Sequence, residues 1–492
     1  MTSLELGEQS QQRLETAERL RAQGIDPYPP RVQRTHTTAA ALRAFEATEV
    51  ADATLPTVCV VGRIVSVRAM GRATFAHLKD GSGRLQFYLK KSVVGPERYA
   101  HFKDFDIGDF IQVKGPLFRT RTGEVTVEVQ DFCMLTKSLH PPPEKWHGLR
   151  DVELRYRQRY ADLIANADVR RIFITRTRLI TAVRRFLDGR GFLEVETPTL
   201  QPLYGGATAR PFITHHQALD RDLYLRIALE LYLKRLLVGG FERVYEIGKN
   251  FRNEGIDIEH NPEFTMLECY QAYADYHDIM ALVEDLFMAV AKELGGGSRL
   301  TYQEQEIDLT PPWPRVPLRQ AIQDATGIDY TAYPDQGSLR RAIDERGLEL
   351  APQPTWAKLV DKLLGKYVRP HTFQPTFFID YPLALSPLAK KKPGDPETVE
   401  RFQPIVAGLE MGNAFTELND PMDQLARFED QVRQRTAGDE EAQPLDEDFV
   451  RALMYGMPPT GGLGIGIDRM VMLFTDQTSI REVILFPQLR TK

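Results

Sequence analysis

The chain has 492 residues, which is too long for one typical hydrophobic core, so two or more domains are expected. Apolar residues make up 42% and charged residues 26%, as in ordinary soluble globular proteins, and the net charge of −6 argues at first sight against a nucleic-acid partner. No run of about 18 apolar residues occurs and the first residues lack a basic region followed by an apolar stretch, so neither a membrane span nor a secretory signal is predicted.

The first predicted element is a helical extension within residues 1–56. The run EQSQQRLETAERLRAQG is polar and amphipathic, ends at Gly24 and is followed by PYPP. The rest of this extension is expected to be irregular.

Residues 57–140 change to a period of two, which indicates strands. Five strands are predicted from the runs VCVVGRIVSVRAM, ATFAHLKD, GRLQFYLK, DFIQVKGPLF and EVTVEVQDFCML, with turns at 81–83 and 121–123. A helix-length insert between the third and fourth strands suggests an OB-type barrel, and an unrelated small barrel or sandwich is the alternative. The segment holds 13 Lys/Arg against 8 Asp/Glu. A modestly basic domain on an acidic body fits docking of nucleic acid, with chance variation in charge as the other explanation.

Three consecutive prolines from Pro141 predict a domain boundary and a linker over 141–167. A long helix follows in the run from 168 to 191, and further helices are predicted over 225–240 and 274–297. Residues from about 310 to 400 are predicted as an insertion of helical runs and loops. Strand signals at 408–420 and 462–474, the second followed by a helix, close the chain. The cysteines are widely spaced and odd in number, which predicts reduced thiols in a cytosolic protein rather than a disulfide framework or zinc cluster: Cys59, Cys133 and Cys269.

The stretch from Tyr245 to Tyr270 concentrates cations, carboxylates and an aromatic residue at strand spacing around a polar turn. In FTMLECY, alternation places Phe264, Glu268 and Tyr270 on one face of a strand. This mixture predicts a site that holds a polyanion and an ammonium group together. A surface hairpin with solvated charges is the alternative.

The run GLGIGIDRM has the spacing GxGxG, not the GxGxxG of dinucleotide loops, and no βαβ unit surrounds it. We interpret it as a strand whose missing side chains let a flat ring lie against the backbone, followed by a helix that carries Arg469. A tight strand–helix junction without a ligand is the alternative.

GRGFLEVETPTL, FRNEGIDIEHNPEF and GLGIGIDRM resemble, in order and spacing, motifs 1, 2 and 3 of the class II aminoacyl-tRNA synthetases. GGATARPF, ALELYLKR and GLEMGNAFTELNDP resemble the lysine-specific branch of the lysine, aspartate and asparagine subgroup. The resemblance implies an α+β fold: an N-terminal OB-fold barrel and, over 168–492, a large catalytic domain built on an antiparallel sheet flanked by helices. It also implies a cytoplasmic homodimer without membrane contact that activates L-lysine with ATP and Mg²⁺ and transfers it to the 3′ end of tRNA(Lys).

In that family the lysine pocket corresponds here to Gly206, Glu230, Arg252, Glu268, Tyr270, Asn413 and Glu417. The resemblance implies that Glu230 takes the α-ammonium, that Glu268 and Glu417 take the ε-ammonium with help from Tyr270, and that Arg252 and Asn413 take the carboxylate. Acidic groups suit a doubly cationic guest, because a desolvated site must balance its charges.

The nucleotide site implied by the resemblance has Arg252 on the α-phosphate, His260 and Arg469 on the triphosphate tail and Phe264 under adenine, with Arg252 and Arg469 as the catalytic cations. Its remaining members are Glu254, Asn261, Glu410, Met411, Gly466, Ile467 and Asp468. The family usually holds Mg²⁺ with two acidic residues seven apart; the second is Glu410, but the first position is Gln403, which adds no negative charge. In the barrel, Arg68, Phe75 and Gln86 correspond to residues that read the anticodon.

Three other functions are considered for the sequence: a related synthetase for another amino acid, a paralogue without catalytic activity, and a paralogue that modifies a protein. A sister enzyme for aspartate or asparagine is disfavoured, because a cation is needed where Glu268 or Glu417 stands. A catalytically silent paralogue that only binds RNA is disfavoured by the otherwise complete set of site residues. A paralogue that lysylates a protein would not need the barrel.

Overall fold

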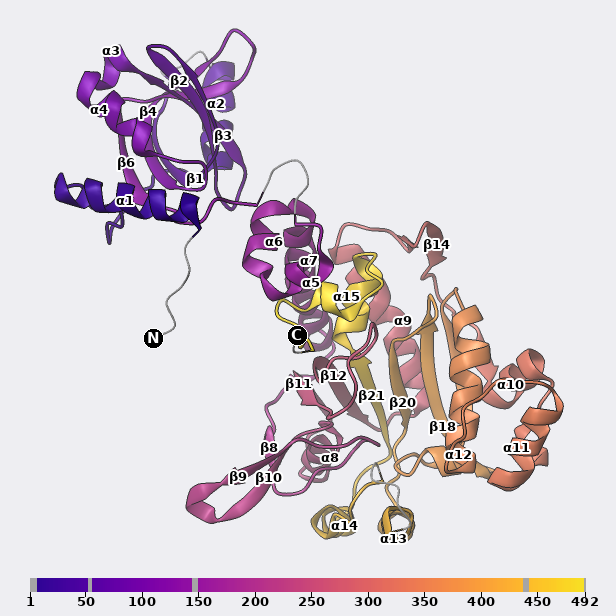
Figure 1. The fold of residues 1–492 in the computed structure, drawn as a ribbon. Coiled ribbons are helices and arrows are strands. Elements are labelled where there is room, and N and C mark those ends of the chain that lie inside the picture. The colour runs from indigo at the N-terminus through magenta and orange to yellow at the C-terminus, as the bar shows by residue number, and fades with distance from the viewer. Residues whose placement is uncertain (1–6, 52–54, 144–148, 437–441, 491–492) are drawn as a thin grey trace. The chain divides into compact units, whose positions relative to one another are not determined.

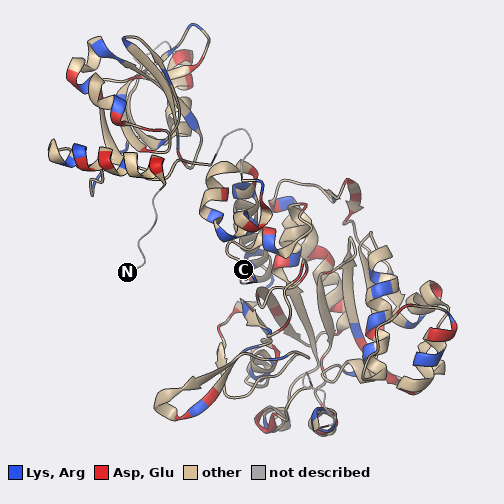
Figure 2. Ribbon diagram, in the orientation of Figure 1, with Lys and Arg blue, Asp and Glu red and all other residues tan. Residues whose placement is uncertain are grey.

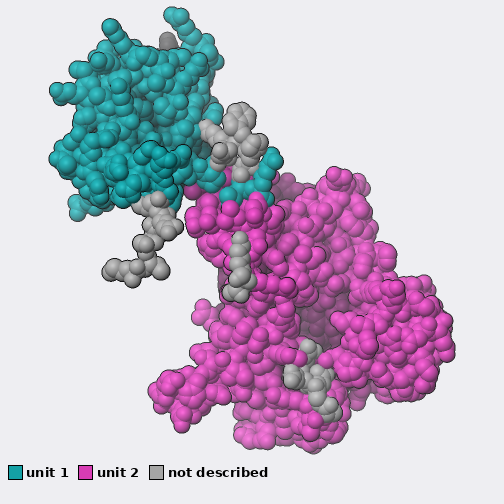
Figure 3. Space-filling model, viewed as in Figure 1, with its two compact units in different colours: residues 1–150 teal, residues 151–492 magenta. Residues whose placement is uncertain are grey.

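The structure is a computed structural model that describes residues 7–51, 55–143, 149–436 and 442–490. The chain forms two compact units, Met1–Arg150 and Asp151–Lys492 (Figure 1). Figure 2 shows Lys/Arg and Asp/Glu on the helices of both units, and Figure 3 colours the two units separately. Among the described residues, no helix is long and apolar enough to cross a membrane.

The first unit is built around a closed barrel of short strands. The order β1-β2-β3-β5-β4 returns to β1, because β1 pairs with β4 as well as with β2. Alternate residues such as Ala76, Leu78 and Phe87 point into the barrel core and are buried. This confirms the OB-type barrel. The strands are β1 Thr57–Met70, β2 Ala73–Lys79, β3 Arg84–Lys90, β4 Phe110–Arg119, β5 Val125–Glu128 and β6 Asp131–Thr136.

The prediction of five strands is wrong in one respect: the fifth run is divided into β5 and β6. β5 pairs with β3 and β4, whereas β6 pairs only with β4, so the chain changes partners between them. Gly115 permits the close approach there, since a Cβ at this position would lie 1.9 Å from the Glu128 carbonyl oxygen. The expected insert between β3 and β4 consists of α3 Lys91–Val94, α4 Pro96–His101 and η1 Phe102–Asp104.

Two helices precede the barrel, α1 (Glu8–Ala22) and α2 (Thr38–Ala51). The first was predicted, but the second lies where irregular chain was expected. It forms because Ala41 and Phe45 are buried in the barrel core, and tertiary burial outweighs the weak local signal.

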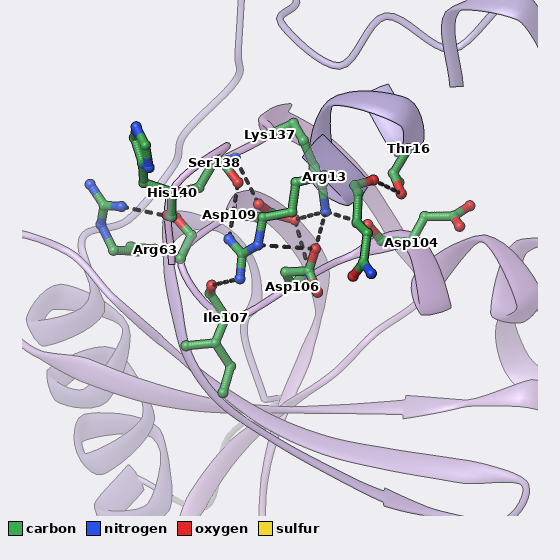
Figure 4. Close-up of polar contacts among 12 residues, drawn as sticks. Arg13, Thr16, Arg63, Asp104, Asp106, Ile107, Asp109, Lys137, Ser138 and His140 are labelled. Carbon is green, nitrogen blue, oxygen red and sulfur yellow. Dashed lines mark hydrogen bonds and ion pairs between the residues drawn. The ribbon is translucent and has the colours of Figure 1, made fainter. Parts of the chain in front are cut away.

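A cluster of polar contacts attaches α1 to the barrel (Figure 4). At its centre the ammonium of the fully buried Lys137 contacts the Asp109 carboxylate at 2.9 Å and the Asp106 carboxylate at 2.6 Å. Arg13 of α1 donates to the backbone carbonyls of Ser138 and Ile107 at 3.0 and 3.2 Å. Each buried charge therefore has partners, as burial of ionised groups requires.

A ten-stranded mixed sheet forms the centre of the second unit, in the order β15-β16-β18-β20-β21-β12-β11-β7, with β17 and β19 paired to β18. The pairs β15–β16 and β11–β7 are parallel and the other pairs along the path are antiparallel. The expected α+β class with helices flanking a sheet is confirmed. The strands are β7 Leu193–Glu194, β11 Arg243–Phe251, β12 Glu263–Ala272, β15 Arg315–Pro317, β16 Thr376–Pro382, β17 Lys391–Lys392, β18 Asp395–Val406, β19 Leu409–Glu410, β20 Gly412–Thr416 and β21 Thr460–Gly466.

Helices cover both faces of this sheet. Leu267 and Cys269 of β12 belong to the core beneath α7, α9 and α15, whereas Tyr270 belongs to the core beneath α8 and α10 to α14. The predicted alternation along β12 is confirmed, and it turns Glu268 and Tyr270 to the second face. The helices are α7 Ala167–Asp188, α8 Glu230–Val238, α9 Tyr276–Glu293, α10 Leu318–Thr326, α11 Gln336–Glu345, α12 Trp356–Leu363, α13 Pro421–Thr436, α14 Glu447–Met454, α15 Ile467–Phe474 and α16 Ile480–Val483.

Two expected segments have more structure than the sequence indicated. Within 141–167, α5 (Val152–Arg157) and α6 (Arg159–Ala165) lie in the second unit, where Arg155 pairs with Glu482 at 3.0 Å. The region at about 310–400, expected as an insertion, contributes β15, β16, β17 and the start of β18 to the central sheet. β15 and β17 are only three and two residues long, and burial along the seven residues of β16 does not alternate, so these strands give no signal with a period of two.

Small elements complete the second unit. A three-stranded sheet β8-β10-β9 includes the hairpin β9–β10, which projects from the body (Figure 1), and β13 pairs with β14. Their bounds, with those of the short helices, are β8 Leu200–Gln201, β9 Ile213–His216, η2 Gln217–Leu219, β10 Arg221–Leu225, β13 Arg299–Tyr302, β14 Gln305–Asp308, η3 Tyr330–Ala332, η4 Leu364–Val368, η5 Arg369–His371 and η6 Leu383–Leu385.

Candidate functional site

A cavity of about 330 Å³ lies in the second unit, over β12, β20 and β21. Figure 3 shows this unit hollowed on the face turned to the viewer. The cavity brings together all the residues expected at the amino-acid end and nearly all of those expected at the nucleotide end. Its lining includes Gly206, Glu230, Arg252, Glu254, His260, Asn261, Phe264, Glu268, Tyr270, Gln403, Glu410, Met411, Asn413, Glu417, Gly466, Asp468 and Arg469.

Ile467 is the exception among the expected residues. It does not line the cavity; its side chain is fully buried in the core shared by α7, α9 and α15. The chain changes from strand to helix at this residue, and the apolar side chain turns to the opposite face of the sheet. The side chain of Ile467 therefore does not face the nucleotide end, and a place for this residue in the nucleotide site through its backbone stays a prediction.

Glu268 contributes a buried carboxylate to the lining of the cavity, and hydrogen bonds hold it in place. One oxygen accepts from the backbone N–H of Leu229 at 2.9 Å, and the other accepts from the Tyr270 hydroxyl at 3.0 Å. Burial, together with the nearby Glu230 charge, raises the pKa of Glu268 to about 7. The group is therefore fixed in orientation and close to its point of ionisation at neutral pH.

Glu230 and Glu417 share a cation that the sequence did not single out. The ammonium of Lys234 lies 2.5 Å from Oε1 of Glu230 and also forms an ion pair with Oε2 of Glu417. Oε1 of Glu417 has no hydrogen-bond partner among the described residues, although the side chain is only 1% exposed. A buried carboxylate oxygen without a partner is costly, so it marks a place for a donor from a ligand.

The glycine run of β21 makes room for these side chains. A Cβ at Gly462 would lie 1.8 Å from Oε1 of Glu417, and one at Gly464 would lie 2.6 Å from the terminal methyl carbon of Met266. The predicted strand and helix are confirmed. The space left by the absent side chains is, however, filled by neighbouring strands and by Glu417.

At the other end of the cavity, cations and an aromatic ring face one another. The Arg252 guanidinium lies 5.0 Å from the centre of the Phe264 ring. Burial lowers the pKa of Arg252, and the carboxylates of Glu254 and Glu268 oppose that effect. An arginine remains charged under such a shift, so this is a fixed positive charge beside a flat apolar surface.

Arg469 and His260 meet at the same end. Arg469 donates to the backbone carbonyl of Glu410 at 2.9 Å, and its Nη2 lies 3.5 Å from Nε2 of His260. Nδ1 of His260 lies 2.9 Å from the Asp257 carboxylate, which orients the ring. Two side chains with nitrogen donors therefore converge from elements that are far apart in the sequence.

Two of the expected nucleotide residues already use their side chains within the protein. Asp468 accepts from Arg176 at 2.6 Å and from the backbone N–H of Thr265 at 2.7 Å. Asn261 donates to the Glu263 carbonyl at 2.6 Å and accepts from the backbone N–H of Gln488 at 3.2 Å. Both line the cavity, but these contacts give them a role in holding its walls together.

Arg401 of β18 is a further residue that sequence reasoning missed. It lines the cavity and donates to Oδ1 of Asn413 at 2.8 Å. Because that oxygen is occupied, the amide N–H₂ of Asn413 is left to serve as the donor toward a ligand. No sequence pattern links residues 401 and 413; strand pairing brings them together.

Gln403 and Glu410 both line the cavity, as expected of a metal site. The carbonyl oxygen of the Gln403 amide, however, accepts from the Tyr381 hydroxyl at 2.8 Å. Glu410 is partly exposed, and Arg369 lies 3.9 Å from its carboxylate. Among the described residues, no group of three or more His, Cys, Asp or Glu side chains is arranged to hold a metal ion.

A second candidate site lies on the barrel. Cross-strand pairing aligns Arg68 with Phe75 and Phe75 with Tyr88, and the rings of Phe75 and Tyr88 stack at 4.3 Å. Phe75 alternates with the buried Ala76 and is half-buried, so it is not part of the barrel core. Tyr88 was missed, although its position two residues after Gln86 in a strand places both on one face.

Gln86 belongs to a polar network on the same face. Its amide donates to the Glu124 carboxylate at 2.7 Å and accepts from the Thr126 hydroxyl at 2.8 Å. Nε2 of His77 lies 2.8 Å from the same carboxylate. Glu124 and His77 were not singled out from the sequence, because Glu124, directly before β5, meets His77 of β2 and Gln86 of β3 only through the fold. Rings, a cation and polar groups together make a surface suited to unpaired bases.

Comparisons with known proteins extend over both units. The family described as tRNA synthetases class II (D, K and N) matches residues 151–490, and the family described as OB-fold nucleic acid binding domain matches residues 58–135. A lysine–tRNA ligase of Roseiflexus castenholzii is 59% identical over 491 residues, which is 99% of this chain and 100% of the relative. A lysine–tRNA ligase of Chloroflexus aurantiacus is 57% identical over 99% of both chains, and one of Moorella thermoacetica is 55% identical over 98% and 97%.

Proposed function

The chain belongs to the family of class II tRNA synthetases (D, K and N), and we propose that it activates L-lysine with ATP and transfers it to the 3′ end of tRNA(Lys). The observation that carries this choice of substrate is the group of three buried carboxylates, Glu230, Glu268 and Glu417, in one cavity. One Glu417 oxygen lacks a partner, and such a site favours an ammonium guest over the side chain of aspartate or asparagine.

Lysine binds with its side chain toward Glu268 and Glu417. The ε-ammonium donates to the free oxygen of Glu417, to the Glu268 carboxylate and to the oxygen of the Tyr270 hydroxyl, whose proton already points to Glu268. Glu230 takes the α-ammonium near Gly206, where a side chain would approach the Cβ of Glu230 to 3.0 Å. Arg252 and the amide N–H₂ of Asn413 hold the carboxylate.

ATP occupies the end of the cavity that carries the cations. Adenine stacks on Phe264, Arg252 contacts the α-phosphate, and His260 and Arg469 contact the β- and γ-phosphates. Glu254, Asn261, Met411, Gly466 and Asp468 shape this end. Fixed cations around a triphosphate stabilise the charge that shifts toward the leaving group.

The reaction has two steps. An oxygen of the lysine carboxylate attacks the α-phosphorus of ATP in line, and the bond from that phosphorus to the oxygen bridging it to the β-phosphorus breaks. Lysyl-adenylate forms and pyrophosphate is released. A ribose hydroxyl at the 3′ end of the tRNA then attacks the lysyl carbonyl, loses its proton, and AMP leaves. The carboxylate is already a nucleophile, so positioning and the charges of Arg252 and Arg469 contribute the rate enhancement of the first step.

A magnesium ion fits this site as a companion of the nucleotide. Mg²⁺ prefers oxygen ligands and is often held by one or two carboxylates together with substrate phosphates. Glu410 supplies one carboxylate at the nucleotide end, while the Gln403 amide oxygen is engaged with Tyr381. Bound there, the ion neutralises phosphate charge.

The remaining assignments follow from the same function. The barrel at 57–140 binds the anticodon through Arg68, Phe75 and Gln86, and residues 168–492 are the catalytic domain. We further propose a cytoplasmic homodimer with α7 at the subunit contact, as the family resemblance implies. The apolar residues Ile172, Leu179, Val183 and Leu187 of this helix are buried within the subunit, and Ile174, which is 54% exposed, is left for such a contact. Light scattering of the purified protein measures the dimer mass, and a monomer at micromolar concentration contradicts this part.

The test of the function is ATP–pyrophosphate exchange with each standard amino acid in turn. We expect exchange with lysine alone. Exchange with aspartate or asparagine replaces this proposal by the sister activity, and no exchange with any amino acid indicates a chain that binds RNA without catalysis.

A further inference from the structure

Lys234 is the most deeply enclosed cation near the cavity, yet it does not line it. Its side chain is fully buried on α8, behind Glu230 and Glu417, whose side chains are 7% and 1% exposed. The ammonium contacts both carboxylates and lies 5.5 Å from the centre of the Phe415 ring. Its donors are therefore directed to two anions and an aromatic face, and none reaches solvent.

Stability alone is a poor explanation for this arrangement. A buried ion pair usually adds little to folding, because desolvation of both charges offsets their attraction. Here the two carboxylates are also those that face the substrate cavity. A buried cation shared by two binding groups therefore points to a role in binding.

We propose that Lys234 is a positioning residue for lysine recognition, an inference that rests on the proposed function. Lys234 keeps Glu230 and Glu417 ionised and oriented, so that the cavity accepts an amino acid with one net positive charge. The amino acid does not need to touch Lys234 for this. Lys234 orients the two carboxylates before lysine binds, which lowers the free-energy cost of ordering them on binding.

The charges at this end of the cavity agree with that role. Three carboxylates, Glu230, Glu268 and Glu417, lie at this end together with three cations, Lys234, Arg252 and Arg401. Lysine adds two ammonium groups and one carboxylate, and Arg252 is the partner of that carboxylate. Loss of Lys234 removes the cation that contacts Glu230 and Glu417 directly, so binding of a proton by these carboxylates becomes more favourable.

The surrounding groups set the direction of the pH effect. Burial raises the pKa of Glu417 well above its ordinary value, and the Lys234 ammonium opposes that rise. Burial likewise raises the pKa of Glu230, opposed by Lys234 and by Arg401 from β18. The Glu268 carboxylate and the Tyr270 hydroxyl of β12 face the same space. Removing the ammonium therefore raises the pKa of Glu230 and Glu417 further, and at neutral pH they bind protons instead of lysine.

The test compares the full-length wild type, Lys234→Met and Lys234→Arg in lysine-dependent ATP–pyrophosphate exchange from pH 6.5 to 9. We expect Lys234→Met to lower kcat/KM for lysine at least roughly tenfold at pH 7, chiefly through KM, since truncating one partner of a buried charge pair has effects of this size. The deficit shrinks as the pH rises toward 9, because a larger fraction of the carboxylates is ionised at higher pH while free lysine, with a side-chain pKa of about 10.4, is still cationic. The KM for ATP stays within about twofold of wild type.

The control is Arg235→Met on the same helix. Arg235 pairs with Asp446 at 2.9 Å and does not line the cavity, so its loss reports the effect of removing a helix cation in general. We expect its lysine KM to match wild type at every pH.

Several outcomes overturn the inference. A Lys234→Met enzyme with wild-type lysine KM, or one whose deficit is the same at all pH values and extends equally to ATP, gives Lys234 a purely structural role. If Lys234→Met does not fold, Lys234→Arg decides, because it keeps the positive charge: a pH midpoint of kcat/KM for lysine that matches wild type supports the inference, and a midpoint shifted to higher pH overturns it. A wild type without lysine-dependent exchange contradicts the proposed function instead.

Discussion

At the scale of single residues, the cavity is defined by which polar atoms already have partners. Both oxygens of Glu268 accept hydrogen bonds from the protein, and Oδ1 of Asn413 accepts one from Arg401. Oε1 of Glu417 accepts none from the described residues. Polar atoms that already have hydrogen-bond partners in the protein fix the orientation of their side chains, and polar atoms without such partners are available to bind the amino acid. The two kinds occur side by side in one buried space, which is the condition for a preorganised site.

The first prediction at this scale is a pH dependence that arises from Glu268. Its pKa is raised to about 7, so the carboxyl becomes protonated as the pH falls through that value and no longer attracts an ammonium. We expect kcat/KM for lysine in ATP–pyrophosphate exchange to decrease below about pH 7, approaching tenfold per pH unit if only the ionised form binds. The corresponding value for ATP, measured with saturating lysine, should change less. A lysine profile that is flat down to pH 5.5 contradicts this assignment.

The second prediction concerns the residue that departs from the family pattern. Gln403→Glu places a carboxylate near Glu410, and the Tyr381 hydroxyl can donate to it as it does to the amide. Added negative charge should tighten the apparent affinity for Mg²⁺ several-fold, read from a Mg²⁺ titration of exchange. Gln305→Glu, on the exposed β13–β14 hairpin, adds the same charge elsewhere and should have no effect. An unchanged titration for Gln403→Glu removes this position from the metal site.

At the scale of elements, β21 determines how closely the cavity walls approach each other. Its glycines oppose Glu268 and Tyr270 of β12 on one side and Asn413 and Phe415 of β20 on the other. A side chain at Gly462 or Gly464 would enter space that the neighbours occupy, whereas Leu463 and Ile465 of the same strand pack into the core on the other face. The strand can line the cavity because its glycines have no side chains there. A β-forming run with larger residues at these positions could not replace it.

Gly462→Ala tests this view of β21. Its Cβ would lie 1.8 Å from Oε1 of Glu417 and 2.7 Å from a ring carbon of Tyr270, so one of them must move. We expect the free energy of unfolding to fall by about 1–3 kcal/mol, as is usual for overpacking, and the KM for lysine to rise. Gly365→Ala adds a methyl group where nothing lies within 4 Å and serves as the control. A Gly462→Ala enzyme with normal lysine KM shows that Glu417 does not depend on this space.

On the barrel, the element that matters is the row formed across β1, β2 and β3 by Arg68, Phe75 and Tyr88. Phe75→Ala removes a ring that is stacked and half-buried, and base–aromatic stacking contributes about 1–3 kcal/mol per base. We expect kcat/KM for tRNA in aminoacylation to fall by a factor of about 5 to 150, while ATP–pyrophosphate exchange, which needs no tRNA, stays near wild type. Equal loss in both assays points to a folding defect and removes the anticodon role.

At the scale of the whole molecule, charge is distributed unevenly over an acidic chain. Residues 57–140 carry 13 Lys/Arg and 8 Asp/Glu, whereas the formal charge of the whole protein is −6. A polyanionic partner is therefore attracted locally and not by the net charge. The reaction at the cavity and the recognition of tRNA are consequently expected to respond differently to salt.

This difference is measurable on the intact protein. Binding of phosphates by Lys and Arg releases counterions, so raising salt from 50 to 200 mM should lower kcat/KM for tRNA several-fold or more. Exchange with lysine and ATP occurs in a partly enclosed cavity and should decline much less, because charges shielded from solvent are weakly screened. Parallel salt dependence in the two reactions contradicts electrostatic docking through the barrel.

The sequence by itself determined the elements with a strong period and the residues with a chemical signature. The barrel strands, the helices at α7 and α9, the β11–β12 hairpin and the alternation that turns Glu268 and Tyr270 toward the cavity all follow from local patterns, because period and residue type are properties of neighbours in the chain. The second helix before the barrel, the division of β5 from β6 and the sheet strands β15 to β17 near 310–400 could not be predicted, since packing against distant residues forms them.

Only the tertiary structure decided which polar groups share a partner. Lys234 lies between Glu230 and Glu417, Arg401 orients Asn413, Arg176 and Thr265 occupy Asp468, and Ile467 turns into the core. Only the Glu230–Lys234 pair, four apart on one helix, had a local spacing that could have indicated it. The other contacts join segments separated by 12 to 292 positions. Their ionisation and orientation depend on distances in space, which strand pairing and helix packing set and which a linear sequence does not contain.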